Sequence, residues 1–285
     1  METLVAAPGP PAAVPAPRPT RAPALQGLRA ALRQAGAALL DFVFPPVCLA
    51  CGGAMEVAAE RLCPACWAAI LQEPQARCRR CGCPLQEAQA TCANCAGWET
   101  SFERAVVLGR FAGPMQQAVH ALKFGGHPEL GPELGRRMAR ALGPELDAVD
   151  LLVPVPLHPA RQRERGYNQS VGLACGLSLG LAEGGRSVPV EAGLVRRCTQ
   201  TRQQARLGPA ERRANLAQAF ACTGAAPASG VVGLVDDVLT TGATLDACAR
   251  VLCQGGAARV WALALASPFN PPCGCADLDP IRPRP

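Results

Sequence analysis

The most informative segment of the chain reads Val231-Val-Gly-Leu-Val-Asp-Asp-Val-Leu-Thr-Thr-Gly-Ala-Thr-Leu245. Its apolar start is typical of a buried strand, which ends in two adjacent acids, Asp236 and Asp237. A small polar loop follows, in which Gly242 allows a backbone angle that a side chain would hinder, and a helix is predicted from about Thr244. Exposed backbone N–H groups and a helix N-terminus therefore meet at one point, which is an anion-binding geometry.

The two acids indicate which anion the loop can hold. Carboxylates would repel a bare phosphate, but they accept hydrogen bonds from the 2′- and 3′-hydroxyls of a ribose whose 5′-phosphate lies in the loop. The segment lacks the Gly-Lys-Ser/Thr of a Walker motif, and it is not a dinucleotide GxGxxG. The alternative is an ordinary strand–turn–helix in which the acids only end the sheet. The predicted phosphate-binding residues are Thr240, Thr241, Gly242, Ala243 and Thr244.

Around this segment the chain alternates between strand and helix patterns. The predicted strands are 105–110, 151–157, 231–235 and 259–266, and the predicted helices are 115–124, 128–142, 168–179 and 244–252. Strands that alternate with helices of this length favour an α/β fold with a mostly parallel sheet.

Eight of the sixteen cysteines form four CxxC pairs in the N-terminal half of the chain. Zinc takes four thiolates in tetrahedral geometry, and one CxxC knuckle brings two sulfurs to the same ion. Two knuckles make a closed site with no position left for water, so the predicted role is structural. The predicted ligands are Cys48, Cys51, Cys63 and Cys66 in one set and Cys78, Cys81, Cys92 and Cys95 in a second. Interleaved pairing of the knuckles stays open, and the alternative to zinc is four separate redox dithiols.

The domain organisation follows from these patterns. We expect a disordered Pro/Ala-rich tail at 1–24, a helix at 25–47, a double zinc ribbon at 48–98, the α/β domain at 99–267 and an irregular tail at 268–285. The ribbon module is poor in long apolar residues, so bound metal would take the place of a hydrophobic core. We expect that loss of one ribbon leaves the melting of the α/β domain unchanged. No apolar run reaches the roughly 18 residues of a membrane span, and no signal-peptide pattern is present, so we expect a cytoplasmic protein.

Charge is unevenly distributed along the chain, whose net charge is +6. Residues 151–221 carry ten arginines and four acids, which could attract phosphates or nucleic acid. The alternative is a set of solvated surface arginines. Lys123 is the only lysine.

The segment at 231–245 closely resembles the phosphoribosyl pyrophosphate (PRPP) signature of type I phosphoribosyltransferases. Further motifs resemble the ComF/GntX family of that type, whose members have N-terminal zinc ribbons. These motifs are VPVPLHP at 153–159, RGYNQ at 165–169, LKF at 122–124 with Gly126, TRQQ at 201–204 and RRAN at 212–215 leading to Phe220. The resemblance covers residues from about 25 to 266.

The resemblance implies a phosphoribosyl transfer in which PRPP reacts with an acceptor and pyrophosphate is released, with Mg²⁺ bound beside PRPP. Asp236 and Asp237 would then be the catalytic acids, and Lys123, Arg161 and Arg165 would bind PRPP. Asn168 and Gln169 would position the acceptor or only start a helix. Thr201, Gln204, Arg212 and Asn215 would belong to a flexible region over the site.

The ComF resemblance also implies a link to DNA uptake and transformation, with single-stranded DNA and DNA-uptake proteins as partners. Some members of the wider superfamily keep the PRPP loop without catalysis. The rival hypothesis is therefore a non-catalytic nucleotide- or single-stranded-DNA-binding competence protein. A third hypothesis is a zinc-stabilised module that serves a partner enzyme.

Overall fold

The structure is a computed structural model that describes residues 46–55, 60–71, 77–83, 92, 95, 99–198 and 219–268. Contacts divide the chain into residues 1–46 and 47–285, and every element described below belongs to the second unit. The tail predicted at 1–24, nearly all of the helix predicted at 25–47 and nearly all of the tail predicted at 268–285 lie outside the described residues.

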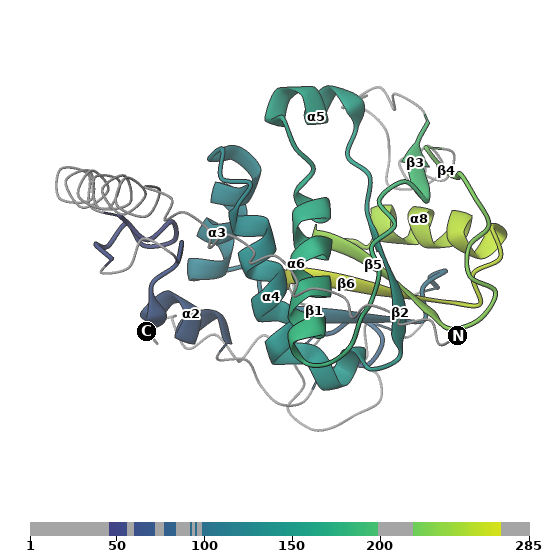
Figure 1. The fold of residues 1–285 in the computed structure, drawn as a ribbon, viewed down its shortest axis with the longest axis horizontal. Coiled ribbons are helices and arrows are strands. Elements are labelled where there is room, and N and C mark those ends of the chain that lie inside the picture. The colour runs from purple at the N-terminus through teal and green to yellow at the C-terminus, as the bar shows by residue number, and fades with distance from the viewer. Residues whose placement is uncertain are drawn as a thin grey trace, which may run out of the picture. The chain divides into compact units, whose positions relative to one another are not determined.

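A parallel sheet forms the centre of the α/β domain (Figure 1). Its strands lie in the order β1 (Arg104–Arg110), β6 (Arg259–Ser267), β5 (Val231–Val238), β2 (Val149–Pro154). All three pairings between neighbouring strands are parallel. The prediction of an α/β fold with a mostly parallel sheet is therefore confirmed.

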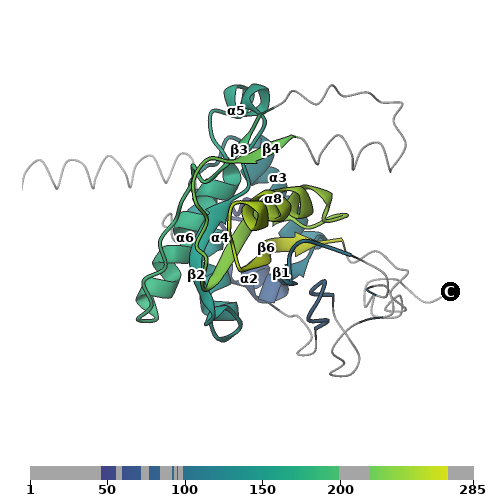
Figure 2. The same ribbon diagram turned by 90° about the vertical axis from the view of Figure 1, so that its right-hand side faces the viewer.

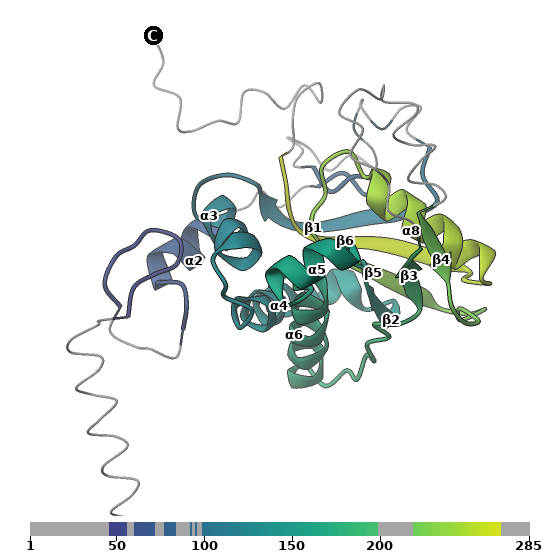
Figure 3. The same ribbon diagram turned by 90° about the horizontal axis from the view of Figure 1, so that it is seen from above.

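Helices cover both faces of this sheet, as a parallel sheet requires (Figure 3). One hydrophobic cluster joins the sheet to a layer of three helices, and a second joins it to a single helix on the opposite face. The three helices are α3 (Gly113–Phe124), α4 (Leu130–Leu142) and α6 (Gln169–Glu183), and the single helix is α8 (Ala243–Gln254). Neighbouring residues of a strand point to opposite clusters. Val106 belongs to the first cluster and Val107 to the second, which is the period of two expected of a strand.

Helices α4 and α6 approach each other closely at two glycines. A Cβ on Gly176 would lie 2.2 Å from the carbonyl oxygen of Pro132, and one on Gly135 would lie 2.3 Å from that of Leu173. Only glycine permits this approach, so the position of α6 against α4 is fixed. The first turn of α6 is thereby held at the carboxyl end of β2 and β5.

Several elements were not predicted from the sequence, among them helix α2 (Pro64–Leu71) and the 3-10 helix η2 (Gly143–Leu146). The segment after β2 contains a short helix, α5 (Pro159–Arg165), and an antiparallel pair joins β3 (Val195–Arg197) to β4 (Phe220–Cys222). Helix α5 has no buried residue, so its sequence lacks the apolar periodicity that marks a helix. Its signals are local: Pro159 begins it and Gly166, with φ 80°, ends it. Figures 1 and 2 show α5, β3 and β4 at the same end of the sheet.

The first ribbon, which carries Cys48 to Cys66, joins the core of the α/β domain. Leu62 and two residues of α2 (Pro64–Leu71), Trp67 and Ile70, are buried in the hydrophobic cluster that contains the buried side of α3. The few apolar residues of this ribbon thus complete a core that the sequence did not indicate. We therefore revise the expectation that the ribbon melts separately from the domain.

The second ribbon, which carries Cys78 to Cys95, covers the free edge of the sheet. The N–H of Ala105 donates to the carbonyl of Arg80 at 2.9 Å. The Arg77 guanidinium donates to the carbonyls of Val107 and Leu108, the second at 2.9 Å. Edge strands expose unpaired backbone groups that invite association, and these contacts cover part of β1.

None of the helices in the described part of the chain is long and apolar enough to cross a membrane.

Candidate functional site

The loop between β5 and α8 has the geometry predicted from its sequence. Strand β5 ends at Val238, α8 begins at Ala243, and Gly242 precedes the helix with φ 74° in the left-handed region. Thr240 and Thr241 are exposed, and Ala243 and Thr244 are half-buried. The first N–H groups of a helix have no partner within it, so this exposed turn can donate to an anion.

Asp237 is buried beside the only lysine of the chain. Its side chain is 4% exposed, and its Oδ1 lies 2.7 Å from Nζ of Lys123 at the end of α3. Its Oδ2 is also buried and has no hydrogen-bond donor among the described residues. A buried acceptor without a donor costs about 1–3 kcal/mol, and in native proteins such groups are few. Lys123, predicted as a PRPP ligand, is thus an ion-pair partner of the second acid.

Asp236 accepts hydrogen bonds through one oxygen. Its Oδ1 accepts from the hydroxyl of Ser170 at 3.1 Å and from the N–H of Asp237 at 2.9 Å. Burial first, and then the neighbouring charge of Asp237, raise the pKa of Asp236 to about 7, although these hydrogen bonds and Lys123 act in the opposite direction. One of the two adjacent acids therefore titrates near physiological pH.

The RGYNQ motif is a scaffold around these acids. Asn168 caps α6, because its Oδ1 accepts from the N–H of Ser170 and its Nδ2 donates to the carbonyl of Val155, both at 3.0 Å. Tyr167 donates its hydroxyl to the carbonyl of Leu122 in α3. Of the two roles considered for Asn168, the structure shows the helix-starting one.

Arg165 is held at the rim of the site by the buried Gln169. One guanidinium nitrogen of Arg165 donates to Oε1 of Gln169 at 2.9 Å. Its carbon Cζ lies 5.0 Å from the ring centroid of Phe124. Arg161 is exposed on α5. Burial first, and then the charges of Arg197, Arg161 and Arg163, lower the pKa of His158, which indicates a positive field at this end of the molecule.

Four of the predicted site residues are not among the residues that the structure describes. These are Thr201, Gln204, Arg212 and Asn215. Sequence reasoning missed Ser170, which is buried in the first turn of α6 and contacts Asp236. No sequence signal marks it, because a serine after a capping asparagine is ordinary at a helix start.

The eight paired cysteines gather in two groups of four, and neighbouring knuckles pair with each other. Within each group the four sulfurs lie within 4.8 Å of one another. The groups are Cys48, Cys51, Cys63 and Cys66, and Cys78, Cys81, Cys92 and Cys95. The interleaved pairing that the sequence left open is not the arrangement seen.

The two groups share a common local geometry. The N–H of Cys63 donates to Sγ of Cys48, and that of Cys92 to Sγ of Cys78, each at 3.2 Å. A glycine in the left-handed region follows each first knuckle, at φ 73° for Gly52 and 74° for Gly82. Four convergent sulfurs supported by N–H donors fit tetrahedral Zn²⁺, and the donor set is complete without water.

Cys83 is a further buried thiol beside the second group. Its hydrogen bond to the Cys81 thiol is the main cause that lowers the pKa of Cys81, to about 5. Its spacing lies outside the CxxC pattern, so the sequence did not connect it with the group.

Comparisons with known proteins agree with this arrangement. A model of the double zinc ribbon domain matches residues 39–96. Competence protein F of Haemophilus influenzae is 32% identical over 228 residues, which cover 77% of this chain and 96% of that protein. The chain belongs to the ComF family. A further relative of this ComF-family chain is DNA utilization protein YhgH of Escherichia coli strain K12, 30% identical over 228 residues, 77% of the chain and 96% of that protein. Competence protein ComFC of Bacillus subtilis is 28% identical over 207 residues, 70% of the chain and 80% of that protein.

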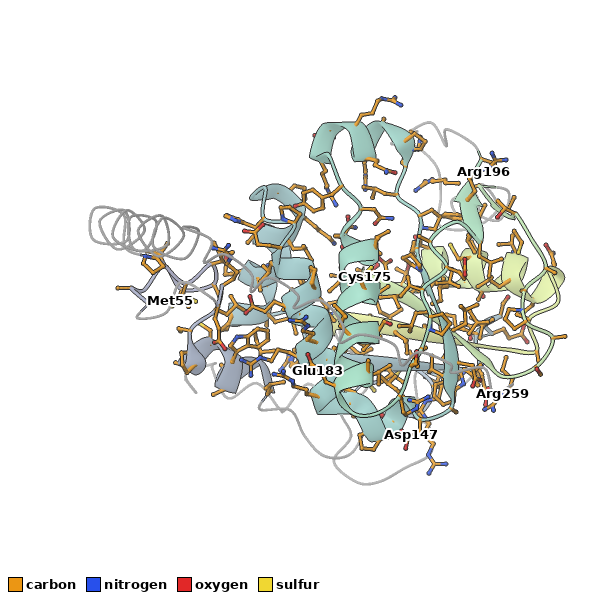
Figure 4. All side chains as sticks on the ribbon, in the orientation of Figure 1. Met55, Asp147, Cys175, Glu183, Arg196 and Arg259 are labelled. Atoms are coloured by element: carbon orange, nitrogen blue, oxygen red, sulfur yellow. The ribbon has the colours of Figure 1, made fainter. Side chains whose placement is uncertain are left out.

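We predict about two zinc ions per chain, one for each group of four thiols. Cys63→Ser should lower this number to about one and should also lower the melting temperature of the α/β domain, because the first ribbon shares the core with α3. Elemental analysis and thermal unfolding monitored by circular dichroism measure both. Cys175→Ser, an exposed position on α6 (Figure 4), should change neither quantity. Iron in place of zinc, or unchanged melting of Cys63→Ser, would contradict this account.

We also predict that Asp236 makes stability depend on pH. The carboxyl of Asp236 has an ordinary pKa of 3.8, which applies to the unfolded chain, and a pKa of about 7 in the folded protein. At a pH between these two values the unfolded chain has lost a proton that the folded chain keeps. The free energy of unfolding therefore falls as pH rises through this window, by at most about 1.4 kcal/mol per pH unit, and levels off above it. Asp236→Asn removes this term and should be more stable than the wild type at pH 8, with a smaller difference at pH 5. Urea titrations at several pH values measure this, and a difference that does not change with pH would contradict it.

Proposed function

We propose that this chain binds PRPP or a related phosphoribosyl compound at the carboxyl end of β5 and transfers the phosphoribosyl group to an acceptor, with release of pyrophosphate. We further propose that it does so in the cytoplasm, in DNA uptake or in the use of DNA. The proposal is supported by the carboxyl pair, by the polar loop that follows it and by the family to which the chain belongs.

The buried Oδ2 of Asp237, which lacks a donor among the described residues, carries this proposal. A buried carboxylate oxygen needs a donor, and the hydroxyls of a ribose supply two at adjacent carbons. Thr240 and Thr241 follow Asp237 by three and four positions, and α8 begins six positions after it, at Ala243. There a 5′-phosphate would accept hydrogen bonds from N–H and O–H groups. An anion alone would not explain the acids, whereas a phosphorylated ribose explains both features.

In the proposed reaction each group of the chain has a limited task. A nucleophilic atom of the acceptor attacks C1 of the ribose while the bond from C1 to the pyrophosphate oxygen breaks. Pyrophosphate leaves with the electron pair of that bond, and the acceptor releases its proton to solvent. Asp236 and Asp237 hold the ribose hydroxyls, and Lys123 keeps the charge of Asp237 balanced. Arg161 and Arg165 have the planar donors that suit pyrophosphate oxygens. The oxygen donors of the two acids also fit Mg²⁺, which when bound would neutralise the leaving pyrophosphate.

The link to DNA comes from the relatives. The Haemophilus relative is named a competence protein and the Escherichia coli relative a DNA utilization protein. The matches cover 96% of the length of each relative, which supports assigning this role to the chain as part of the proposal.

A second candidate function is binding of single-stranded DNA without turnover. It is favoured by exposed arginines at the end of the sheet where the site lies. Arg161 and Arg163 are exposed on α5, and Arg196 is exposed on β3 at the same end (Figure 4). Affinity that falls steeply with salt, in the absence of any PRPP turnover, would favour this function over the enzyme.

We predict that Asp236→Asn combined with Asp237→Asn weakens PRPP binding by about tenfold or more. The substitutions keep the shape of both side chains, but each charge-assisted hydrogen bond contributes about 1.5–3 kcal/mol, which is a factor of ten or more in affinity. The dependence of binding on Mg²⁺ should be lost as well. Calorimetric titration of PRPP into both proteins, with and without Mg²⁺, measures these changes.

The matched control is Asp147→Asn, an exposed acid at the end of the molecule opposite α5 (Figure 4). It should bind PRPP as the wild type does. If the double variant binds PRPP with wild-type affinity and differs only in its melting temperature, the acids merely end the sheet and the proposal fails.

A further inference from the structure

The ring of Phe124 is unusually exposed for a residue of its type. It is the last residue of α3, and the residue is 72% exposed. Among the large apolar side chains of the described residues this fraction is the highest, and the next is Val47 at 51%. Burial of a phenyl ring is strongly favourable, so a ring left in solvent at this position is not explained by the core.

Polar and charged groups surround this ring. The Arg165 guanidinium lies over it, with Cζ 5.0 Å from the centroid. The His120 ring meets it edge to face, with centroids 5.8 Å apart, and the Phe111 ring lies 6.1 Å beyond His120. A single exposed ring with a guanidinium over it is a poor surface for an apolar protein segment. It is a suitable surface for a planar, electron-rich group that carries a phosphate.

Three contacts hold the ring at the rim of the candidate site. The preceding residue, Lys123, pairs with Asp237 at 2.7 Å. Tyr167 donates to the carbonyl of Leu122 and so ties the end of α3 to the start of α6. Arg165, which covers the ring, is anchored by Gln169, whose neighbour Ser170 donates to Asp236 at 3.1 Å. The two acids and the ring are therefore positioned by the same short segments.

We propose that Phe124 is a stacking platform for the nucleobase of the acceptor, and equally for the base of the nucleoside 5′-monophosphate that its transfer would produce. Arg165 lies over one face of the ring, so the base would stack on the other face. This inference rests on the proposed function, because the base would have to lie next to the ribose that Asp236 and Asp237 hold. It adds the chemical class of the acceptor, a planar heteroaromatic base. Stacking on an aromatic ring is tolerant of base identity, so several bases should bind.

The test compares ligands that differ only in the base. The four common ribonucleoside 5′-monophosphates and ribose 5-phosphate are titrated into the full-length, zinc-loaded protein by calorimetry. In the wild type at least one nucleotide should bind about tenfold more tightly than ribose 5-phosphate, which is the usual gain from stacking one base. Phe124→Ala should bring the ratio of nucleotide affinity to ribose 5-phosphate affinity close to one. Phe124→Trp should keep this ratio or raise it.

The matched control is Leu179→Ala, which removes another exposed apolar side chain from the middle of α6. It should leave the ratio unchanged. Because Phe124 is exposed, melting curves of its variants should match the wild type, so a lost ratio reports binding and not unfolding.

Each other outcome has a definite meaning. If the wild type binds neither PRPP nor ribose 5-phosphate, the proposed function is overturned. Binding of PRPP with a nucleotide ratio near one in the wild type, or with an equal ratio in Phe124→Ala, overturns this inference and leaves the proposed function intact. A loss in Phe124→Ala that affects a single-stranded oligothymidine but no mononucleotide also overturns it, since the ring would then contact a strand.

Discussion

Two consecutive residues near the end of β5 carry carboxylates, and the free energy of holding both of them in the folded protein constrains the structure around them. One is buried against Lys123, and the other accepts hydrogen bonds from Ser170 and from the backbone of its neighbour. Burial and mutual repulsion still raise the pKa of Asp236 to about 7. Such an arrangement is unfavourable for stability by itself. It is understandable where a ligand supplies donors or positive charge, as in sites that keep strained groups for their function.

The zinc ribbons are connected to this pair through the fold. The first ribbon buries Leu62, Trp67 and Ile70 in the cluster that contains α3, and the last turn of α3 carries Lys123 and Phe124. The second ribbon completes the hydrogen bonding of β1 at the edge of the sheet. We therefore expect zinc in this ComF-family chain to stabilise more than its own module. Loss of metal would weaken the surroundings of the site although no zinc ligand reaches the acids.

Local patterns predicted much of this architecture, and tertiary contacts explain what they missed. The β5–loop–α8 unit and the pairs of cysteines follow from residues close in sequence, where strand pattern, glycine geometry and ligand spacing are all visible. Helix α5 was missed because it is polar on every side. The Lys123 to Asp237 pair and the Ser170 contact join residues far apart in the chain, which no periodicity indicates. For Asn168 the sequence left two roles open, and only the contacts of its amide favoured the cap.

The most direct test of the central claim is a crystal structure of the zinc-loaded protein soaked with PRPP and Mg²⁺. We expect the 5′-phosphate in the turn at 240–244 and the ribose hydroxyls within hydrogen-bond distance of Asp236 and Asp237, with an oxygen of the ligand beside Oδ2 of Asp237. A ligand held only by the arginines of α5, with the carboxyl pair unchanged and the turn free of phosphate, would contradict the account.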